Sequence, residues 1–216
     1  MRILVAGMFR SGSTRLYNLL REAAAEQVGS PVRAGFPGSD AELERVLALP
    51  TPCVVKSHIL TDKIVDEIRS GRVTAVATIR EPMPALVSMC EALSYSPESA
   101  AAQMDQALQW LERIAEAAAI VPYETAVSQR SGDVRRVTRA AGLSIGRRSA
   151  RRLGRRWDRA LGVELSDAAA QPFDPVTLFH PNHVGAPRGL GLPGHATLVA
   201  EVERRRLDAR FGALCR

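Results

Sequence analysis

Short, largely apolar runs alternate along this chain with longer segments whose apolar residues recur every three or four positions. Four of the runs, at 2–6, 53–58, 73–79 and 119–124, have the length of a β-strand. Nearly unbroken apolar character is typical of strands that are covered on both faces in a parallel sheet. The pattern therefore predicts four buried parallel strands.

The periodic segments predict helices between and after these strands. Residues 29–39 are rich in Gly, Pro and Ser and predict a loop. On the longest expected helix, apolar residues from Met104 to Ala118 form one stripe, which packing against a core explains. The expected helices cover residues 14–28, 40–48, 61–70, 81–93, 97–118, 131–141, 147–161 and 195–210.

Strands that alternate with helices imply right-handed crossovers and a mainly parallel sheet with helices on both faces. We therefore expect a three-layer α/β fold, formed by residues 1–216 as a single domain. Ligands of such folds bind at the carboxyl ends of the strands. Three strand ends carry polar chemistry, namely the loop after Gly7, the segment Lys56-Ser57-His58, and Arg80.

Composition and charge add one feature to this picture. Apolar residues make up 46% of the chain and charged residues 24%, as in ordinary globular proteins. The net charge is +6, and ten arginines with a single acid, Asp158, lie between Arg135 and Arg159. Such a block is either a solvated helix face or a surface for nucleic acid, anionic lipid or a polyanionic substrate.

Cysteine usage and hydropathy indicate the compartment. Cys53, Cys90 and Cys215 are scattered without a C-x-x-C pair, which predicts reduced thiols and neither a disulfide framework nor a zinc site. The apolar run that follows the first two residues is too short for a signal peptide, and no run is long enough to span a membrane. We therefore expect a cytoplasmic protein without a membrane span.

The most informative motif is GMFRSGSTRL at residues 7–16. Gly7, Gly12 and the hydroxyl of Thr14 match the phosphate-binding loop G-x-x-x-x-G-K-[ST], but Ser13 stands where that loop has its lysine. Backbone N–H groups and the helix dipole favour an anion at such a turn, and Arg10 adds a cation. The alternative is a turn with a purely structural role.

The missing lysine argues against nucleoside triphosphate chemistry. In nucleotide kinases and hydrolases that lysine reaches the β- and γ-phosphates, and an aspartate at a strand end holds magnesium. Here the third strand is followed by Arg80, and none of the expected strands ends cleanly in Asp. No metal site is therefore expected.

These motifs resemble those of the sulfotransferases that use 3′-phosphoadenosine 5′-phosphosulfate (PAPS), which have a P-loop NTPase-like fold. FRSGSTRL resembles their 5′-phosphosulfate loop, and IREPMPALVS resembles their 3′-phosphate motif of an arginine and a serine eight residues later. In VVKSHIL, His58 stands at the position of the usual catalytic base. The resemblance implies catalytic roles for His58, Lys56 and Arg10, and cofactor contacts by Arg10, Ser11, Gly12, Ser13, Thr14, Arg80 and Ser88.

Two further residues follow from the same resemblance, which covers residues 1–142 and 183–189. Tyr123, in IVPYE, would approach the adenine of PAPS, and Arg188, in HVGAPRG, would reach the 3′-phosphate. One departure is Arg15, because members of the family often have tryptophan at this position. The resemblance therefore does not define the acceptor pocket. The acceptor is expected to be a hydroxyl of a small molecule, glycan or lipid.

Two other functions remain as alternatives to sulfuryl transfer. A P-loop nucleotide kinase or NTPase would bind ATP with magnesium. A basic, non-catalytic module would bind polyanions through the arginines of residues 135–159, but Trp157 is the one aromatic residue among them, so base stacking is poorly supported and nucleic acid is not expected as a partner.

Overall fold

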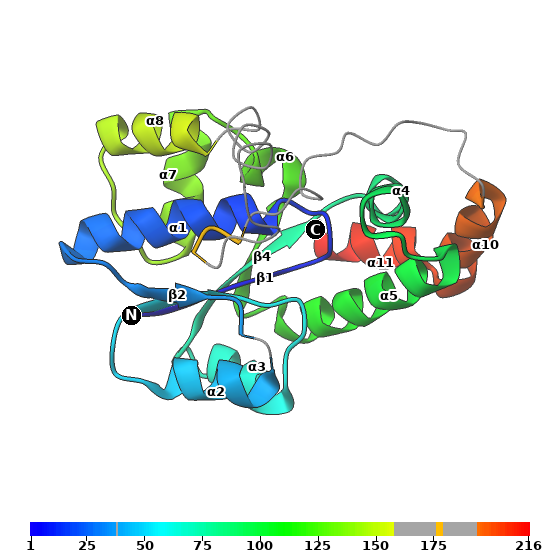
Figure 1. Ribbon diagram of the computed structural model, residues 1–216, viewed down its shortest axis with the longest axis horizontal. Coiled ribbons are helices and arrows are strands. Elements are labelled where there is room, and N and C mark those ends of the chain that lie inside the picture. The colour runs from blue at the N-terminus through cyan, green and yellow to red at the C-terminus, as the bar shows by residue number, and fades with distance from the viewer. Residues whose placement is uncertain (38, 158–175, 179–193) are drawn as a thin grey trace.

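A five-stranded parallel sheet forms the centre of the molecule in the computed structural model, which describes residues 1–37, 39–157, 176–178 and 194–216 (Figure 1). The strand order is β2-β3-β1-β4-β5. All four neighbouring pairs are parallel, which confirms the predicted sheet. The strands are β1 (Arg2–Gly7), β2 (Arg33–Gly35), β3 (Cys53–Lys56), β4 (Thr74–Ile79) and β5 (Ala118–Pro122).

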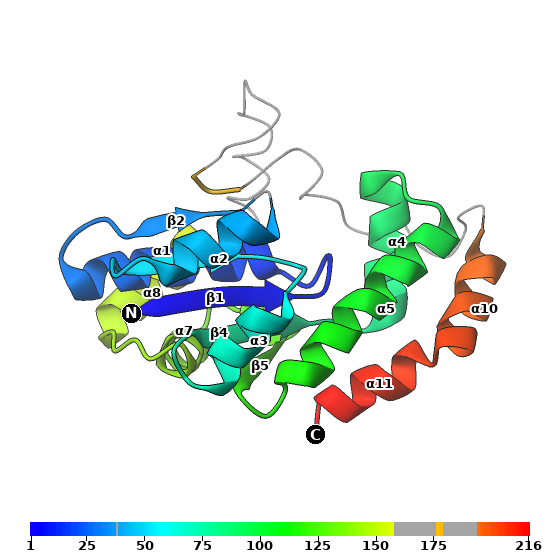
Figure 2. The same cartoon turned by 90° about the horizontal axis from the view of Figure 1, so that it is seen from below.

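Helices cover both faces of the sheet, so that the fold has the three layers expected from the sequence (Figures 1 and 2). One face carries α1 (Ser13–Val28), α6 (Tyr123–Ala126), α7 (Ser131–Ala140) and α8 (Arg147–Arg156). The other face carries α2 (Asp40–Ala48), α3 (Asp62–Arg69), α4 (Pro82–Leu93), α5 (Pro97–Ile114), α10 (His195–Arg205) and α11 (Leu207–Leu214).

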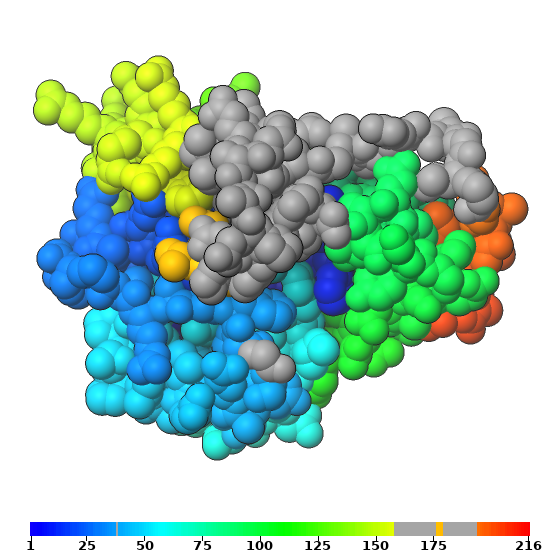
Figure 3. Space-filling view, viewed as in Figure 1, coloured from blue at the N-terminus to red at the C-terminus, as the bar shows by residue number. Residues whose placement is uncertain are grey.

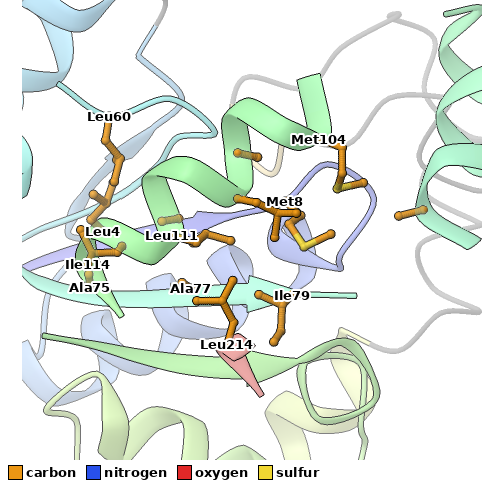
Figure 4. Close-up of a cluster of buried hydrophobic side chains, with 14 of the residues drawn as sticks. Leu4, Met8, Leu60, Ala75, Ala77, Ile79, Met104, Leu111, Ile114 and Leu214 are labelled. Atoms are coloured by element: carbon orange, nitrogen blue, oxygen red, sulfur yellow. The ribbon is translucent and has the colours of Figure 1, made fainter. Parts of the chain in front are cut away.

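The central strand β1 supplies side chains to both hydrophobic cores. Leu4 packs with α5 and its neighbours on one face, whereas Ile3 and Val5 pack with α1 on the other. Figure 4 shows the first of these cores, where Leu4 lies beside Ile114 of α5 and Ala77 lies below Leu111 in the view. Because successive side chains of a strand point to opposite faces, a strand buried on both must be apolar throughout. This explains why the apolar runs predicted strands.

Some element boundaries differ from the expected ones. β2 lies within residues 29–39, which were expected to form a loop, and β3 ends at Lys56, so the expected strand at 53–58 is two residues too long. The expected helix at 97–118 ends at Ile114, because Ala118 pairs with Ala75 of β4 and begins β5. In-register pairing with the sheet outweighs helical propensity there.

The helices of the C-terminal half differ from the expected ones in two places. The expected helix at 195–210 is two helices, α10 and α11, separated by Arg206, whose φ of 53° is left-handed. The expected helix at 147–161 is observed over α8, and residues 158–161 lie outside the described part of the chain. The single-turn helix α6 was not predicted.

The three cysteines are free thiols, as expected. Within the described ranges, no group of His, Cys, Asp or Glu side chains is arranged to hold a metal ion. None of the helices found there combines the length and the apolar character that crossing a membrane requires.

Candidate functional site

The predicted site residues gather at the carboxyl edge of the sheet. β1 lies between β3 and β4, so that the loop after Gly7 is flanked by Lys56 at the end of β3 and by Arg80 just after β4. The order of the strands, which the sequence does not state, therefore places the three polar strand ends side by side. This is the edge at which parallel α/β folds bind ligands.

The loop after β1 is fastened to β4. Gly7 lies opposite Thr78, and a Cβ atom at Gly7 would come within 2.2 Å of the Thr78 Oγ1 atom. The hydroxyl of Ser11 donates to the carbonyl of Met8 at 2.6 Å and lies 2.5 Å from Thr78 Oγ1. Ser11 is fully buried, so its hydroxyl holds the loop together and only its backbone is left for a ligand.

Helix α1 begins directly after the loop at Gly12. Gly12 has a left-handed φ of 82°, which favours glycine, and no side chain caps the helix. The first turn, with Ser13 and Thr14 buried in it, contains no acidic residue. No carboxylate of this first turn therefore offsets the positive end of the helix dipole, which favours an external anion.

Arg10 connects the loop to the two residues of the predicted 3′-phosphate motif. Its Nε donates to the Ser88 Oγ atom at 2.8 Å, and its carbonyl accepts from Nη1 of Arg80 at 3.1 Å. Ser88 comes from α4 and is buried. Burial and the charge of Arg80 both lower the pKa of the Arg10 guanidinium. The structure thus brings Arg10, Arg80 and Ser88 into one cluster.

Tyr123 lies against this cluster from α6. The Cζ atom of Arg80 is 4.3 Å from the centroid of the Tyr123 ring, a cation–π contact. A Cβ atom at Gly12 would lie 3.4 Å from Cδ2 of the same ring. Tyr123 therefore supports both Arg80 and the start of α1.

Lys56 is buried at the end of β3, with 5% of its surface exposed. Loss of solvent lowers the pKa of its ammonium group to about 7, and the charge of Arg10 adds to that effect. Its Nζ atom lies 5.1 Å from the centroid of the Phe36 ring. An anion placed beside such a half-ionised lysine stabilises its protonated form, so that anion binding is favoured here.

His58 follows β3 in a turn, in which the Ser57 hydroxyl donates to the carbonyl of Ile59 at 2.6 Å. The Nδ1 atom of His58 lies 2.8 Å from the carbonyl oxygen of Gly7. A carbonyl only accepts, so Nδ1 carries the proton and Nε2 of the neutral ring is an acceptor. The imidazole stacks on Phe9, with ring centroids 4.3 Å apart.

The pKa of His58 is lowered to about 3, first by burial and then by the charge of Lys56. The ring is therefore neutral at neutral pH. His58 does not belong to the strand that the sequence predicts over residues 53–58, because β3 ends at Lys56. The turn and the bond to Gly7 bring His58 to the site instead.

Arg15, which stands where members of the family often have tryptophan, is buried and hydrogen-bonded within the protein. It is 7% exposed, and its guanidinium donates to the carbonyls of Ala126, Ser128, Gly154 and Trp157. These contacts fasten α1 to α6 and α8 across the sheet face. The side chain points into the protein, where these carbonyls hold its guanidinium group.

Sequence reasoning missed three neighbours of the site, namely Thr78, Phe9 and Phe36. Their roles depend on which strands are adjacent, and the sequence motifs do not contain that information. Phe36, which is 44% exposed, lies 6.1 Å from the His58 ring, measured between centroids. Arg188 lies outside the described residues.

Comparisons with known proteins agree with this architecture. No family model matches the sequence, and no curated protein does. Among solved structures, mouse sulfotransferase SULT7A1 complexed with PAP is similar with a TM-score of 0.60 and 16% identity, over 99% of this chain and 86% of that one. Retinol dehydratase in complex with androsterone and inactive cofactor PAP is similar with a TM-score of 0.54 and 13% identity, over 99% and 81%.

These likenesses extend over nearly the whole chain, although the sequences have diverged far. They agree with the parallel sheet, its strand order and the helices on both faces. The chain therefore has the α/β fold of the sulfotransferases.

Proposed function

We propose that this protein is a PAPS-dependent sulfotransferase, formed by residues 1–216 as one domain, which moves the sulfuryl group of PAPS to an acceptor hydroxyl. The observation that carries the proposal is the meeting of Arg10, Lys56 and Arg80 with the His58 base at the carboxyl edge of the sheet. The fold that the chain shares with PAP-bound sulfotransferases supports it.

The charges of the site fit a ligand with two separate anionic groups. Among the described residues, neither Lys56 nor Arg80 forms an ion pair with a carboxylate, so both charges can be used by a ligand. The loop and the start of α1 suit the 5′-phosphosulfate, and Arg80 with Ser88 suits the 3′-phosphate. Arg10 lies between the two positions and links them.

The residues would divide the work of an in-line displacement. Bound PAPS supplies an activated sulfuryl group, whose bond to the 5′-phosphate breaks as the bond to the acceptor oxygen forms. His58 Nε2 takes the proton of the acceptor hydroxyl during the attack. Lys56, Arg10 and the N–H groups at the start of α1 stabilise the negative charge on the sulfuryl oxygens and on the departing phosphate.

Anion binding would also tune these groups. The pKa values of Lys56 and His58 are low because both are removed from water near other cations. A bound polyanion raises both values, since it stabilises the protonated forms. Lys56 then becomes fully cationic where the charge is needed, and Nε2 of His58 becomes a stronger proton acceptor.

The proposal also includes the chemical class of the acceptor and the cellular location of the protein. Phe9 stacks on His58 and Phe36 lies beside it, so a small-molecule, glycan or lipid hydroxyl would approach next to apolar groups. The free thiols support a reducing, cytoplasmic location.

The thermal stability of the protein in the presence of two nucleotides separates this function from that of a P-loop kinase or NTPase. We expect PAP to raise the melting temperature equally with magnesium and with EDTA, and Arg80→Ala to abolish the effect. Arg139→Ala, which changes an exposed arginine of α7, is the matched control. Stabilisation by ATP with magnesium, and none by PAP, would refute the proposal.

A further inference from the structure

Helix α8 carries six arginines in its ten residues. In an α-helix, residues four positions apart lie on one side with a rise of about 6 Å. The arginines therefore form two parallel rows. The outer row consists of Arg147, Arg151 and Arg155, and the inner row of Arg148, Arg152 and Arg156. All six side chains are exposed.

The rest of α8 is used for packing within the protein. Ala150, Leu153 and Gly154 are buried against the core that α1 and α7 share. Trp157, just after the helix, is only 3% exposed. The outward side of α8 therefore offers charge alone, with neither an apolar side chain to enter a membrane nor an aromatic ring to stack on a base.

Two arginines of the inner row already pair with glutamates of α1 inside this molecule. Arg152 contacts Glu26 of α1 at 2.7 Å, and Arg156 contacts Glu22 at 3.2 Å. The two glutamates are four residues apart, as are the two arginines. Two glutamates on one face of α1 thus match two arginines on one face of α8, because both pairs follow the same helical spacing.

Within the described ranges, the outer row has no such neighbour. The described part of the chain provides no ion-pair partner for Arg147, Arg151 or Arg155. Together with Arg148 and Arg152, they line a surface depression of about 470 Å³. Figure 3 shows α8 at the surface, on the side of the molecule away from α10 and α11. This depression is separate from the site at the carboxyl edge.

We propose that the outer arginine row is a docking surface for an acidic α-helix of another protein, with carboxylates at positions i, i+4 and i+8. The spacing argument is taken from the inner row, where Glu22 and Glu26 show the mode of pairing. Guanidinium groups bind carboxylates through paired hydrogen bonds, which suits arginine better than lysine. The docking does not depend on the proposed activity.

Peptide binding to the full-length protein tests this surface. The probe is a fluorescent helical peptide with Glu at i, i+4 and i+8, and its control has the same composition with the Glu positions scattered around the helix. Fluorescence anisotropy should show tighter binding of the ordered peptide. Exposed ion pairs each contribute little, so reversing all three arginines (R147E, R151E and R155E) predicts roughly a tenfold to hundredfold loss of affinity.

Matched variants keep the result interpretable. Reversal of Arg33, Arg45 and Arg216, which are exposed and lie elsewhere, changes the net charge equally and should weaken binding far less. R151Q is a milder change for the case that the triple variant fails to fold, and it should still weaken the ordered peptide more than the scattered one. Unchanged stabilisation by PAP in R151Q would show that the carboxyl-edge site is intact.

Three outcomes would overturn the proposal. These are equal affinity for the ordered and scattered peptides, no binding of either, and tighter binding of duplex DNA or phosphatidylserine vesicles with the same dependence on the outer row. The last result would assign the surface to phosphate groups, and a steep loss of affinity with salt would accompany it.

Discussion

Replacing Lys56 by Met should stabilise the protein while removing its activity. Met has a similar length and no charge, so it fills the buried position without the cost of an ammonium group. The pKa of Lys56 falls from its ordinary 10.5 to about 7 in the folded protein. At 1.36 kcal/mol for each pH unit, this shift corresponds to about 4 kcal/mol of destabilisation at pH 7.

The pH dependence isolates this electrostatic contribution. Between the folded pKa of about 7 and the unfolded 10.5, the unfolded chain holds more protons than the folded protein. The free energy of unfolding of the wild type therefore rises with pH in this window. Urea unfolding should show that the advantage of Lys56→Met over the wild type shrinks by about 1.5 kcal/mol from about pH 7 to about pH 8.5.

Lys63→Met is the matched control, because Lys63 is exposed and pairs with the partly exposed Glu44 at 3.0 Å. Its stability difference from the wild type should stay nearly constant over the same pH range. If the wild type and Lys56→Met change in parallel with pH, Lys56 is not held in a partly neutral state, and the electrostatic account of the site is wrong.

Three further predictions follow from the site. At about pH 8, PAP binding should take up close to one proton through Lys56, because the anion raises the pKa of its ammonium group from about 7. Calorimetry in buffers of different ionisation enthalpy measures this uptake, which should vanish in Lys56→Met. His58→Ala should lower turnover roughly 10² to 10⁴-fold with PAP affinity unchanged, and unchanged turnover would exclude His58 as the base. Gly7→Ala should destabilise the fold by roughly 1–3 kcal/mol, since its Cβ would lie 2.2 Å from Thr78 Oγ1, whereas Gly35→Ala, with open space around it, should have little effect on the urea midpoint.

The sequence predicted the features that depend on local pattern. The strands β1, β3 and β4 were found because burial on both faces makes them apolar, and the loop at Gly7 was found because its glycines have a fixed spacing. The edge strand β5 is only partly buried, and it was found from its short apolar run. β2 was missed because its three residues, Arg33, Ala34 and Gly35, lie at the sheet edge and carry no apolar pattern. The boundary between α5 and β5 has no helix-breaking residue, so pairing with β4 alone determines it.

Features of the site that depend on distant contacts could not be predicted in this way. Arg15 is satisfied by carbonyls more than a hundred residues away, so its buried role leaves no local signal. Thr78 could have been noticed as a hydroxyl on an otherwise apolar strand, but its contact with Gly7 requires the register of β1 and β4. The link from Arg10 to Ser88 likewise exists only once α4 is placed beside the loop.

Direct titration of PAP into the protein in EDTA tests the central claim most closely. The site predicts binding of one PAP per chain without metal, with the affinity strongly reduced in Arg80→Ala and in Ser88→Ala and retained in Arg139→Ala. Heat of binding for ATP with magnesium, together with none for PAP, would contradict the assignment of this edge of the sheet to PAPS.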